Sequence, residues 1–582
     1  MRTLVHVTHE AVVKVGGIGA VLHGLFTSRA YAQAVERSLL IAPLWSEDPP
    51  ETVLSSTGTV LYSSVHGIDP GDYGSRLRPV EEQTGTRFVY GRRRFTDPLS
   101  GITLDPEVLL VDVRRIRPEP LATLKYNMFR RFGIESYRWD ASWEYEQYVR
   151  LAVGGYAALP ALGIGRTGEP AAILAHEFMG LPLAYAAIID GNPAFKTFLY
   201  AHEVPTLRRI VEGNPGHDTM VYPLLARALT ANRYADELFD QQVAFFKHPL
   251  VRAAVNLDGI LCVGEQLVDE LNFLGPEMAR ARKHVVYNGL PFSPCDAAQK
   301  ERSRKLVLDY IERLLGHRPD YVFTHVGRFV LSKAYWRDLK VLWHIDQGLR
   351  QRGKTAVMIL LTTERGGPQP WETIRQLELG HSWPVVHREG GADLTPGEAG
   401  LYQHIQKLNM CARNTRVIFV NQFGFERDVL GEAAPKEMTW LDLRIASDLE
   451  LGMSIYEPFG IAPLEPLSFG GLCLISNVCG SAGFALRAAG EADPETVIVG
   501  DFTALPGGPH TLETLRAVGA AERDAVEEQV GRQCAAEVVR RLPENDKERL
   551  ELMAKGSALA SRMSWDVVVE DYLLPALRGA TR

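Results

Sequence analysis

Two glutamates with seven residues between them, Glu457 and Glu465, lie where the chain combines a tight turn with a helix start. The prolines and the glycine between them are typical of a loop that leads into a helix. The pattern predicts Glu457 in the loop and Glu465 one turn into a helix that begins near Ile461. Carboxylates accept hydrogen bonds from hydroxyl groups, and the amides of Phe459, Gly460 and Ile461 can donate to an anion. The stretch suits a ligand with hydroxyl groups and phosphates, whereas a helix cap with two solvated glutamates is the alternative.

A second candidate anion site lies near the N-terminus. An apolar strand over residues 4–7 is followed by a loop with Glu10, then by Lys14, Gly16 and Gly17, and by a helical pattern over residues 20–35. Strand, glycine-rich turn and helix together form the phosphate-binding geometry of a doubly wound sheet. The turn is not G-x-G-x-x-G and lacks G-K-[ST], so dinucleotide and P-loop interpretations are weak.

Two histidines each follow a predicted buried strand. His176 is followed by Glu177, and His202 ends the next strand along the chain. Ligands bind beyond the carboxyl ends of parallel strands, so the two pairs are expected to lie on adjacent strands and to converge. Neither H-E pair has the second histidine of an H-E-x-x-H zinc site. Support of two separate loops is the alternative for each histidine.

Two cations and a second glycine turn complete the set of candidates. Arg328 and Lys333 stand five positions apart after a predicted strand and before a helix, which predicts a diphosphate clamp. An apolar run over residues 472–478 leads into a turn whose Gly480 and Ser481 offer further amides. Asn288 precedes a glycine in a turn that needs no function to explain it.

These segments, in this order, resemble those of the glycogen and starch synthases, which are retaining glycosyltransferases of the GT-B fold. The matching motifs are K-x-G-G, the two strand-then-histidine units, R-x4-K, E-x7-E and a closing S-W…Y. The resemblance implies an α/β fold of two Rossmann-like doubly wound domains that face each other across a cleft, with a C-terminal helix crossing back to the N-domain. It implies donor-sugar contacts for Glu457, His202 and Asn288, ribose contacts for Glu465, diphosphate contacts for Lys14, Arg328 and Lys333, and a carboxylate at Glu177 where the family often has Asp.

Length and composition agree with this organisation. At 582 residues the chain is too long for a single core, and we predict domains at 1–292 and 293–565 and a C-terminal helix at 566–582. A long connection over residues 364–414 predicts an insertion that serves as a lid, an acceptor surface or an oligomer contact. Six scattered cysteines indicate neither a zinc site nor a disulfide framework.

The charge and the hydropathy exclude other classes of protein. A net charge of −8 argues against a general nucleic-acid binder. The longest uncharged apolar run, residues 151–165, is too short to span a bilayer, so we expect a cytoplasmic protein without a membrane partner. Self-association into a homo-oligomer stays open.

The function implied by the resemblance is transfer of glucose from ADP-glucose or UDP-glucose to the non-reducing end of an α-1,4-glucan, with retention. Features of both donor types occur, so the nucleobase stays open. No D-x-D stands where a metal-dependent transferase would need it; we expect no metal, and no cofactor beyond the nucleotide-sugar substrate. The alternatives are a GT-B enzyme with a small acceptor such as a sucrose or trehalose type, a phosphorylase, and a non-catalytic glucan-binding protein.

Overall fold

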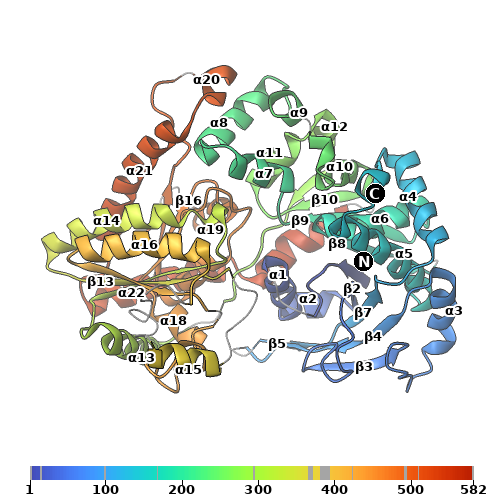
Figure 1. Ribbon diagram of the computed structural model, residues 1–582, viewed down its shortest axis with the longest axis horizontal. Helices are drawn as coiled ribbons and strands as arrows, with labels where there is room; N and C mark the ends of the chain where they lie inside the picture. The colour runs from blue at the N-terminus through green and yellow to red at the C-terminus, as the bar shows by residue number, and fades with distance from the viewer. Residues whose placement is uncertain are drawn as a thin grey trace. The chain divides into compact units, whose positions relative to one another are not determined.

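The computed structural model describes residues 3–12, 16–97, 100–166, 168–240, 242–292, 295–364, 371–380, 393–422, 424–490, 494–508 and 510–579. These residues form two compact α/β units (Figure 1). The first unit comprises Met1–Leu207, Ala228–Gly289 and Trp565–Arg582, and the second comprises Arg208–Arg227 and Leu290–Ser564. Lys14, a predicted phosphate ligand, lies outside the described residues.

A nine-stranded sheet forms the centre of the first unit, in the order β11-β10-β9-β8-β1-β2-β7-β4-β3. Neighbouring strands are parallel from β11 to β7, and the last two pairings are antiparallel. The strands are β1 (Thr3–Val7), β2 (Arg37–Leu44), β3 (Gly58–Ser63), β4 (Phe88–Arg93), β7 (Glu107–Asp112), β8 (Ala171–His176), β9 (Phe195–Ala201), β10 (Gly259–Cys262) and β11 (Lys283–Val285). A separate hairpin consists of β5 (Phe95–Thr96) and β6 (Thr103–Leu104).

The helices of the first unit lie in the connections between its strands. They are α1 (Gly17–Phe26), α2 (Arg29–Ala34), α3 (Gly74–Thr84), α4 (Pro118–Phe132), η1 (Ser136–Trp139), α5 (Trp143–Ala161), α6 (Glu177–Asp190), α9 (Ala235–Leu238), η2 (Gln242–Ala244), α10 (Lys247–Arg252), η3 (Ala253–Asn256), α11 (Glu265–Asn272) and α12 (Pro276–Arg280). The single helix predicted over residues 20–35 is wrong, because α1 ends at Phe26 and Ser28 begins a new helix. The Ser28 side chain accepts a hydrogen bond from the Tyr31 amide and so caps α2.

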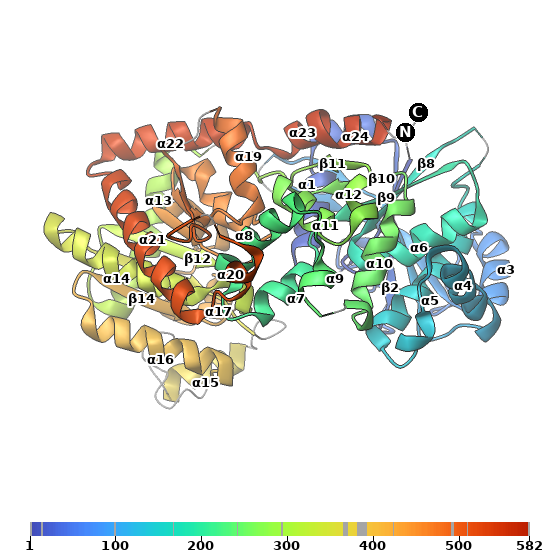
Figure 2. The same ribbon diagram turned by 90° about the horizontal axis from the view of Figure 1, so that it is seen from above.

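The C-terminal segment belongs to the first unit, as the predicted crossing-back helix requires. It consists of α23 (Trp565–Val568), the π-helical turn η7 (Val569–Leu573) and α24 (Leu574–Gly579), and Figure 2 shows α23 and α24 in red. The Trp565 ring packs on Gly24 so closely that a Cβ there would lie 2.0 Å from the indole nitrogen. Asp566 accepts hydrogen bonds from the Ser28 hydroxyl, at 2.6 Å, and from the Ala30 amide, at 3.0 Å.

The second unit contains a fully parallel six-stranded sheet in the order β14-β13-β12-β15-β16-β17. Numbered within the unit, this is the order 3-2-1-4-5-6 of a Rossmann-like sheet. The strands are β12 (Tyr321–Val326), β13 (Ala356–Leu361), β14 (Thr415–Val420), β15 (Leu449–Gly452), β16 (Leu472–Ser476) and β17 (Val497–Gly500).

Helices lie on both faces of this second sheet, and each face has its own apolar cluster. In Figure 1, α14 and α16 lie above the strands and α13 and α18 below them. The helices are α13 (Ala297–Leu315), η4 (Leu331–Lys333), α14 (Tyr335–Arg352), α15 (Trp371–Gly380), α16 (Pro396–Cys411), α17 (Arg427–Leu430), α18 (Trp440–Ala446), η6 (Ala462–Phe469), α19 (Gly480–Ala489), α20 (Leu512–Arg516), α21 (Ala520–Arg541) and α22 (Asp546–Ser561). The predicted insertion at 364–414 thus contains α15 and α16, while 365–370 and 381–392 lie outside the described residues.

One grouping was not predicted from the sequence. Residues 208–227, in the middle of the predicted first domain, group with the second unit, and the division falls inside α7 (Pro205–Gly213) and α8 (His217–Thr230). A buried ion-pair network accounts for this grouping. Arg337 donates to Asp218 at 2.6 and 2.9 Å and to Glu527 at 2.8 Å, and all three side chains are fully buried.

Candidate functional site

The second unit gathers its candidate residues where the strand order reverses. The strands β12 and β15 are neighbours, but the strand after β12 lies toward one edge of the sheet and the strand after β15 lies toward the other edge. In open α/β sheets, ligands bind beyond the carboxyl ends of the strands at such a point. Arg328 and Lys333 follow β12, and Glu457 follows β15. A backbone hydrogen bond from the Ile455 amide to the Ser332 carbonyl, at 2.8 Å, joins the two loops.

Glu457 and Lys333 form an ion pair, so two residues 124 positions apart that were predicted separately lie in contact. Both side chains are largely covered, with 15% and 16% of their surfaces exposed. The Ser454 hydroxyl also lies 3.4 Å from a Glu457 carboxylate oxygen. A carboxylate and an ammonium group thus form a polar centre at the point where the strand order reverses. A sugar phosphate could bind there by replacing their contact, with its phosphate on the ammonium group and its hydroxyls on the carboxylate.

Arg328 differs from Lys333 in its surroundings. Its side chain is exposed, and among the described residues its guanidinium has no ion-pair partner. Its backbone is held instead, because the Tyr335 hydroxyl donates to the Arg328 carbonyl at 2.9 Å. The guanidinium is therefore available to a ligand while its loop is fixed.

The predicted amide donors divide into two groups. Within the described part of the chain, the amides of Gly460 and Ile461 have no acceptor, and Gly460 has a φ of +85°, which favours glycine. The Gly480 amide, by contrast, donates to the Glu457 carbonyl at 3.0 Å and the Ser481 amide to the Phe459 carbonyl at 2.9 Å. The expectation that Gly480 and Ser481 offer free amides is therefore wrong, because the start of α19 is used to hold the Glu457 loop.

Glu465 lies within the helical segment η6, which is a 3-10 helix, and one of its carboxylate oxygens is 3.0 Å from Arg444 Nε. Arg444 is itself held by a second carboxylate, since its guanidinium donates to buried Glu450 at 2.8 Å. Glu450 also accepts from the Val326 amide at the end of β12, at 3.0 Å. This chain of contacts fixes Glu465, whose side chain keeps 24% of its surface exposed. Sequence reasoning missed Arg444 and Glu450.

In the first unit, the prediction that the two strand-then-histidine units converge is confirmed. The strands β8 and β9 are parallel neighbours, and His176 Nδ1 lies 2.9 Å from His202 Nε2. A third histidine, His6 of β1, extends the contact, since its Nδ1 lies 3.0 Å from His176 Nε2. Burial lowers the pKa of His6 and of His202 to about 3 and that of His176 well below its usual value, so all three are neutral. Sequence reasoning missed His6, which lies within the apolar strand β1.

Glu177 has a different surrounding from the one expected of a sugar ligand. Its backbone adopts a φ of +61°, which is uncommon for a residue with a side chain. Its carboxylate accepts hydrogen bonds from the backbone amides of His202 and Glu203, the latter at 2.6 Å. Glu177 thus holds the segment that carries His202.

The glycine turn before α1 also differs from expectation. One oxygen of the buried Glu10 carboxylate accepts from the Gly16 and Gly19 amides, each at 2.8 Å. The Gly16 amide is therefore not free for a phosphate, whereas the space beside the Cα of Gly17 is open. Asn288 lies buried beyond the end of β11, and within the described residues its side-chain oxygen has no hydrogen-bond partner.

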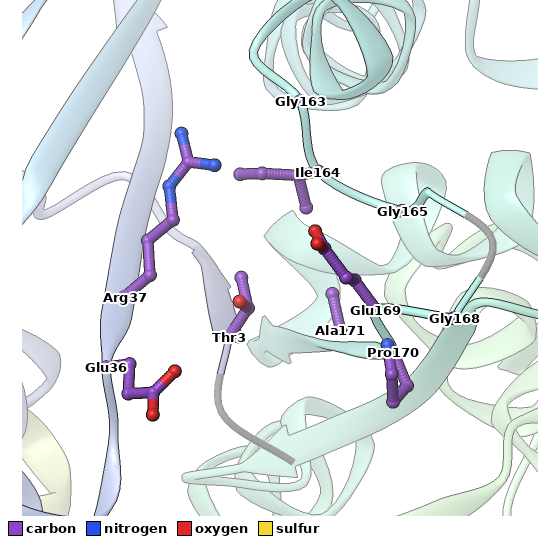
Figure 3. Close-up of a pocket in the computed structure, with 10 residues that line it drawn as sticks. All are labelled: Thr3, Glu36, Arg37, Gly163, Ile164, Gly165, Gly168, Glu169, Pro170 and Ala171. Atoms are coloured by element: carbon purple, nitrogen blue, oxygen red, sulfur yellow. The ribbon is translucent and has the colours of Figure 1, made fainter.

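A pocket of about 640 Å³ lies at the amino ends of β1, β2 and β8, the edge of the sheet opposite to the histidines. Figure 3 shows Arg37, Glu36 and Glu169 around it. The Arg37 guanidinium is already paired with Glu107 at 2.7 Å. None of the predicted site residues lines this pocket, so it does not contribute to the candidate site.

Two kinds of feature are absent from the described residues. Over this part of the chain, no group of three or more His, Cys, Asp or Glu side chains is arranged to hold a metal ion. No described helix is both long and apolar enough to cross a membrane.

One known structure resembles the fold with a TM-score above 0.5, and two others align over nearly the whole chain at lower scores. The catalytic domain of starch synthase IV from Arabidopsis thaliana, bound to ADP and acarbose, superposes with a TM-score of 0.53 at 13% identity, covering 100% of this chain and 99% of that one. Sucrose-phosphate synthase from Thermosynechococcus elongatus gives 0.46 at 13% identity, with 100% and 99% covered. A trehalose-6-phosphate protein from E. coli, bound with UDP-2-fluoro glucose, gives 0.47 at 13% identity, with 99% and 98% covered.

The chain therefore has the GT-B fold, with two Rossmann-like units and the C-terminal helix returned to the first. At 13% identity the likeness concerns the fold. No protein-family model matches the sequence, and no curated protein matches it either.

Proposed function

We propose that this protein is a retaining glycosyltransferase that moves glucose from ADP-glucose or UDP-glucose to the non-reducing end of an α-1,4-glucan. The observation that carries the proposal is the polar centre of the second unit, where Lys333 and Glu457 are in contact beside the acceptor-free amides of Gly460 and Ile461. A sugar bonded to a diphosphate needs both hydroxyl acceptors and anion donors, and this centre contains both.

The chemistry assigns a task to each group. As the bond between the sugar C1 and the phosphate oxygen breaks, negative charge develops on the diphosphate, and Lys333 and Arg328 stabilise it. Binding of the diphosphate draws Lys333 away from Glu457, which leaves that carboxylate to accept from the sugar hydroxyls. The acceptor hydroxyl attacks from the face that the leaving group vacates and transfers its proton to a phosphate oxygen. No covalent bond to the enzyme forms.

The remaining residues bind substrate in this proposal. Glu465, fixed by Arg444, accepts from the ribose hydroxyls of the donor. His202 binds a sugar hydroxyl, and Asn288 contributes its unpaired side-chain oxygen. The cations carry the role that a metal ion has in other transferases, so the reaction is proposed to need no metal.

One experiment tests the proposal. The purified chain is incubated with glycogen and either ADP-glucose or UDP-glucose, and nucleotide release and glucan-bound glucose are measured. Release that depends on glycogen supports the proposal and identifies the donor. Release with glucose or a sugar phosphate as acceptor, and none with glycogen, favours the small-acceptor alternative. Binding to glycogen without release from either donor contradicts an enzymatic role.

A further inference from the structure

A continuous line of hydrogen bonds runs from His202 into the core of the first unit. It passes from His202 to His176 at 2.9 Å, from His176 to His6 at 3.0 Å and from His6 to the Tyr31 hydroxyl at 2.9 Å. It ends at the Ser38 hydroxyl, 2.9 Å from Tyr31. His6 and His176 each use one ring nitrogen on either side, so each has a neighbour before and after it, whereas His202 uses only Nε2 within this line. We call this set of five residues the histidine relay.

Stacking holds the rings of the relay in position. The rings of His176 and His202 are nearly parallel, at 7° to each other with centroids 5.2 Å apart, and Tyr200 stacks on His202 at 4.5 Å. His6 and Tyr31 are fully buried. The rings cannot turn over without breaking these contacts, so the positions of the ring nitrogens are fixed.

The protonation of the relay is coupled from one end to the other. A neutral imidazole carries one hydrogen, so it donates on one side and accepts on the other. If Tyr31 donates to His6, then His6 must donate to His176, and His176 must donate to His202. The hydrogen of His202 is then on Nδ1. If the direction is reversed at Tyr31, every ring changes tautomer and His202 Nδ1 becomes an acceptor.

The two directions do not have equal energies. A phenol is a better hydrogen-bond donor than an aliphatic hydroxyl and a poorer acceptor, while an imidazole nitrogen is a good acceptor. The arrangement in which Ser38 donates to Tyr31 and Tyr31 to His6 is therefore favoured. At the open end, His202 Nδ1 is buried and has no partner among the described residues.

From this geometry we infer that Tyr31, His6 and His176 are positioning residues, which set His202 as the Nδ1–H tautomer so that it donates to a hydroxyl oxygen of the bound sugar. The sugar as the occupant rests on the proposed function, whereas the tautomer does not. The relay also accounts for the placement of Tyr31, His6 and His176 in line with His202. A reversed relay would offer a lone pair instead and would select a different orientation of the sugar hydroxyl.

The test compares Tyr31→Phe with Tyr145→Phe. Tyr145 is also buried in the first unit and bonds a serine, Ser136, at 2.6 Å, but it is outside the relay. The tautomer of His202 is determined from 15N chemical shifts of histidine-labelled protein, with assignment by loss of the signal in His202→Asn. We expect the Nδ1–H tautomer in the wild type and in Tyr145→Phe, and a mixture or the opposite tautomer in Tyr31→Phe.

Kinetics give a second measurement on the same variants. Tyr31→Phe should raise the donor KM by ~3- to 10-fold, the size expected for one buried hydrogen bond, and Tyr145→Phe should not. Two results would overturn the inference: a wild-type His202 that carries no hydrogen on Nδ1, or a His202 tautomer that is unaffected by Tyr31→Phe. If the tautomer shifts as expected while no donor is turned over, the relay stands and the proposed function fails.

Discussion

The candidate residues of the two units are held by opposite means. In the first unit, His202 belongs to an uncharged line of hydrogen bonds whose three histidines are kept neutral by burial. In the second unit, Lys333, Glu457 and Glu465 are held by ion pairs at the edge of the sheet, with part of each side chain exposed. Neutral imidazoles are suited to contacts with an uncharged sugar, whereas a cationic side chain that can leave its ion pair is suited to contacts with a diphosphate. Under the proposed function, the first unit would contact the sugar through uncharged groups, and the second unit would contact both the sugar and the diphosphate through charged groups.

The largest expected effect comes from removal of the Lys333 charge. Lys333→Ala should lower kcat by ~100-fold or more, because a fixed cation stabilises the leaving diphosphate mainly in the transition state. Lys305→Ala is the control, since Lys305 is an exposed lysine of the same unit paired with Asp309. Steady-state measurement of nucleotide release provides the comparison. Equal kcat in Lys333→Ala and Lys305→Ala would show that Lys333 does not stabilise the leaving diphosphate.

The two glutamates should differ from each other. Glu457→Gln should lower kcat by ~10-fold or more, because the transferred sugar changes its charge and position during the reaction. Glu465→Gln should raise the donor KM by ~10-fold with little change in kcat, because the ribose is bound alike in both states. Glu528→Gln, at an exposed glutamate paired with Arg532, is the control. A kcat effect at Glu465 and a KM effect at Glu457 would reverse the assignment.

The neutral histidines should make the first unit sensitive to acid. The pKa of His6 is about 3 in the folded chain, and a histidine in an unfolded chain titrates near 6.5. Below pH 6.5, His6 is protonated in the unfolded chain but stays neutral in the folded chain. The free energy of unfolding therefore decreases as the pH falls toward 3. His6 contributes about 1.4 kcal/mol per pH unit over this window. His176, with its pKa lowered in the same way, adds a loss of the same sign.

Denaturant unfolding at pH 7 and pH 5 measures this loss. His6→Gln should make the difference between the two pH values smaller, and His404→Gln, at an exposed histidine of the second unit, should leave it as in the wild type. If the difference in unfolding free energy between pH 7 and pH 5 is the same in His6→Gln as in the wild type, His6 is protonated in the folded chain. The first unit would then not be held by neutral histidines alone.

The smallest expected effect is that of chelation. Activity should persist in EDTA within about a factor of two, because Lys333 and Arg328 carry the charge that a metal ion would otherwise neutralise. Addition of Mg²⁺ or Mn²⁺ to chelated enzyme is the matched measurement. Loss of activity on chelation, restored by either ion, would show that the second unit needs a metal in addition to its cations.

The local order of elements was predictable because its causes are local. Short apolar runs marked β1, β8, β12 and β16, with a glycine or proline beside the last three, and the polar residues that follow these strands stood out by type. The contact between His176 and His202 followed from this order, because consecutive parallel strands end at the same edge of a sheet. The same reasoning failed at Ser28, where one capping side chain divided a helix that the apolar pattern had predicted as continuous.

Hydrogen-bond partners that are set by packing were not predictable. The Gly16 amide bonds a carboxylate six residues away and the Gly480 amide bonds the Glu457 carbonyl, but the residue types around these glycines do not indicate which acceptor each amide meets. An amide bonds whichever acceptor the packing brings within about 3 Å, and that depends on strand register and loop path.

The sequence by itself determined most of the elements and their order, and it supplied the candidates for contacts with a sugar phosphate, which stay predictions. The tertiary structure decided which of these groups are already satisfied, that Lys333 pairs with Glu457, and that His6 and Tyr31 stand behind His202. The physical reason is one of range. Backbone preference and apolar periodicity act over a few residues, whereas hydrogen bonds and ion pairs are chosen after the whole sheet has assembled.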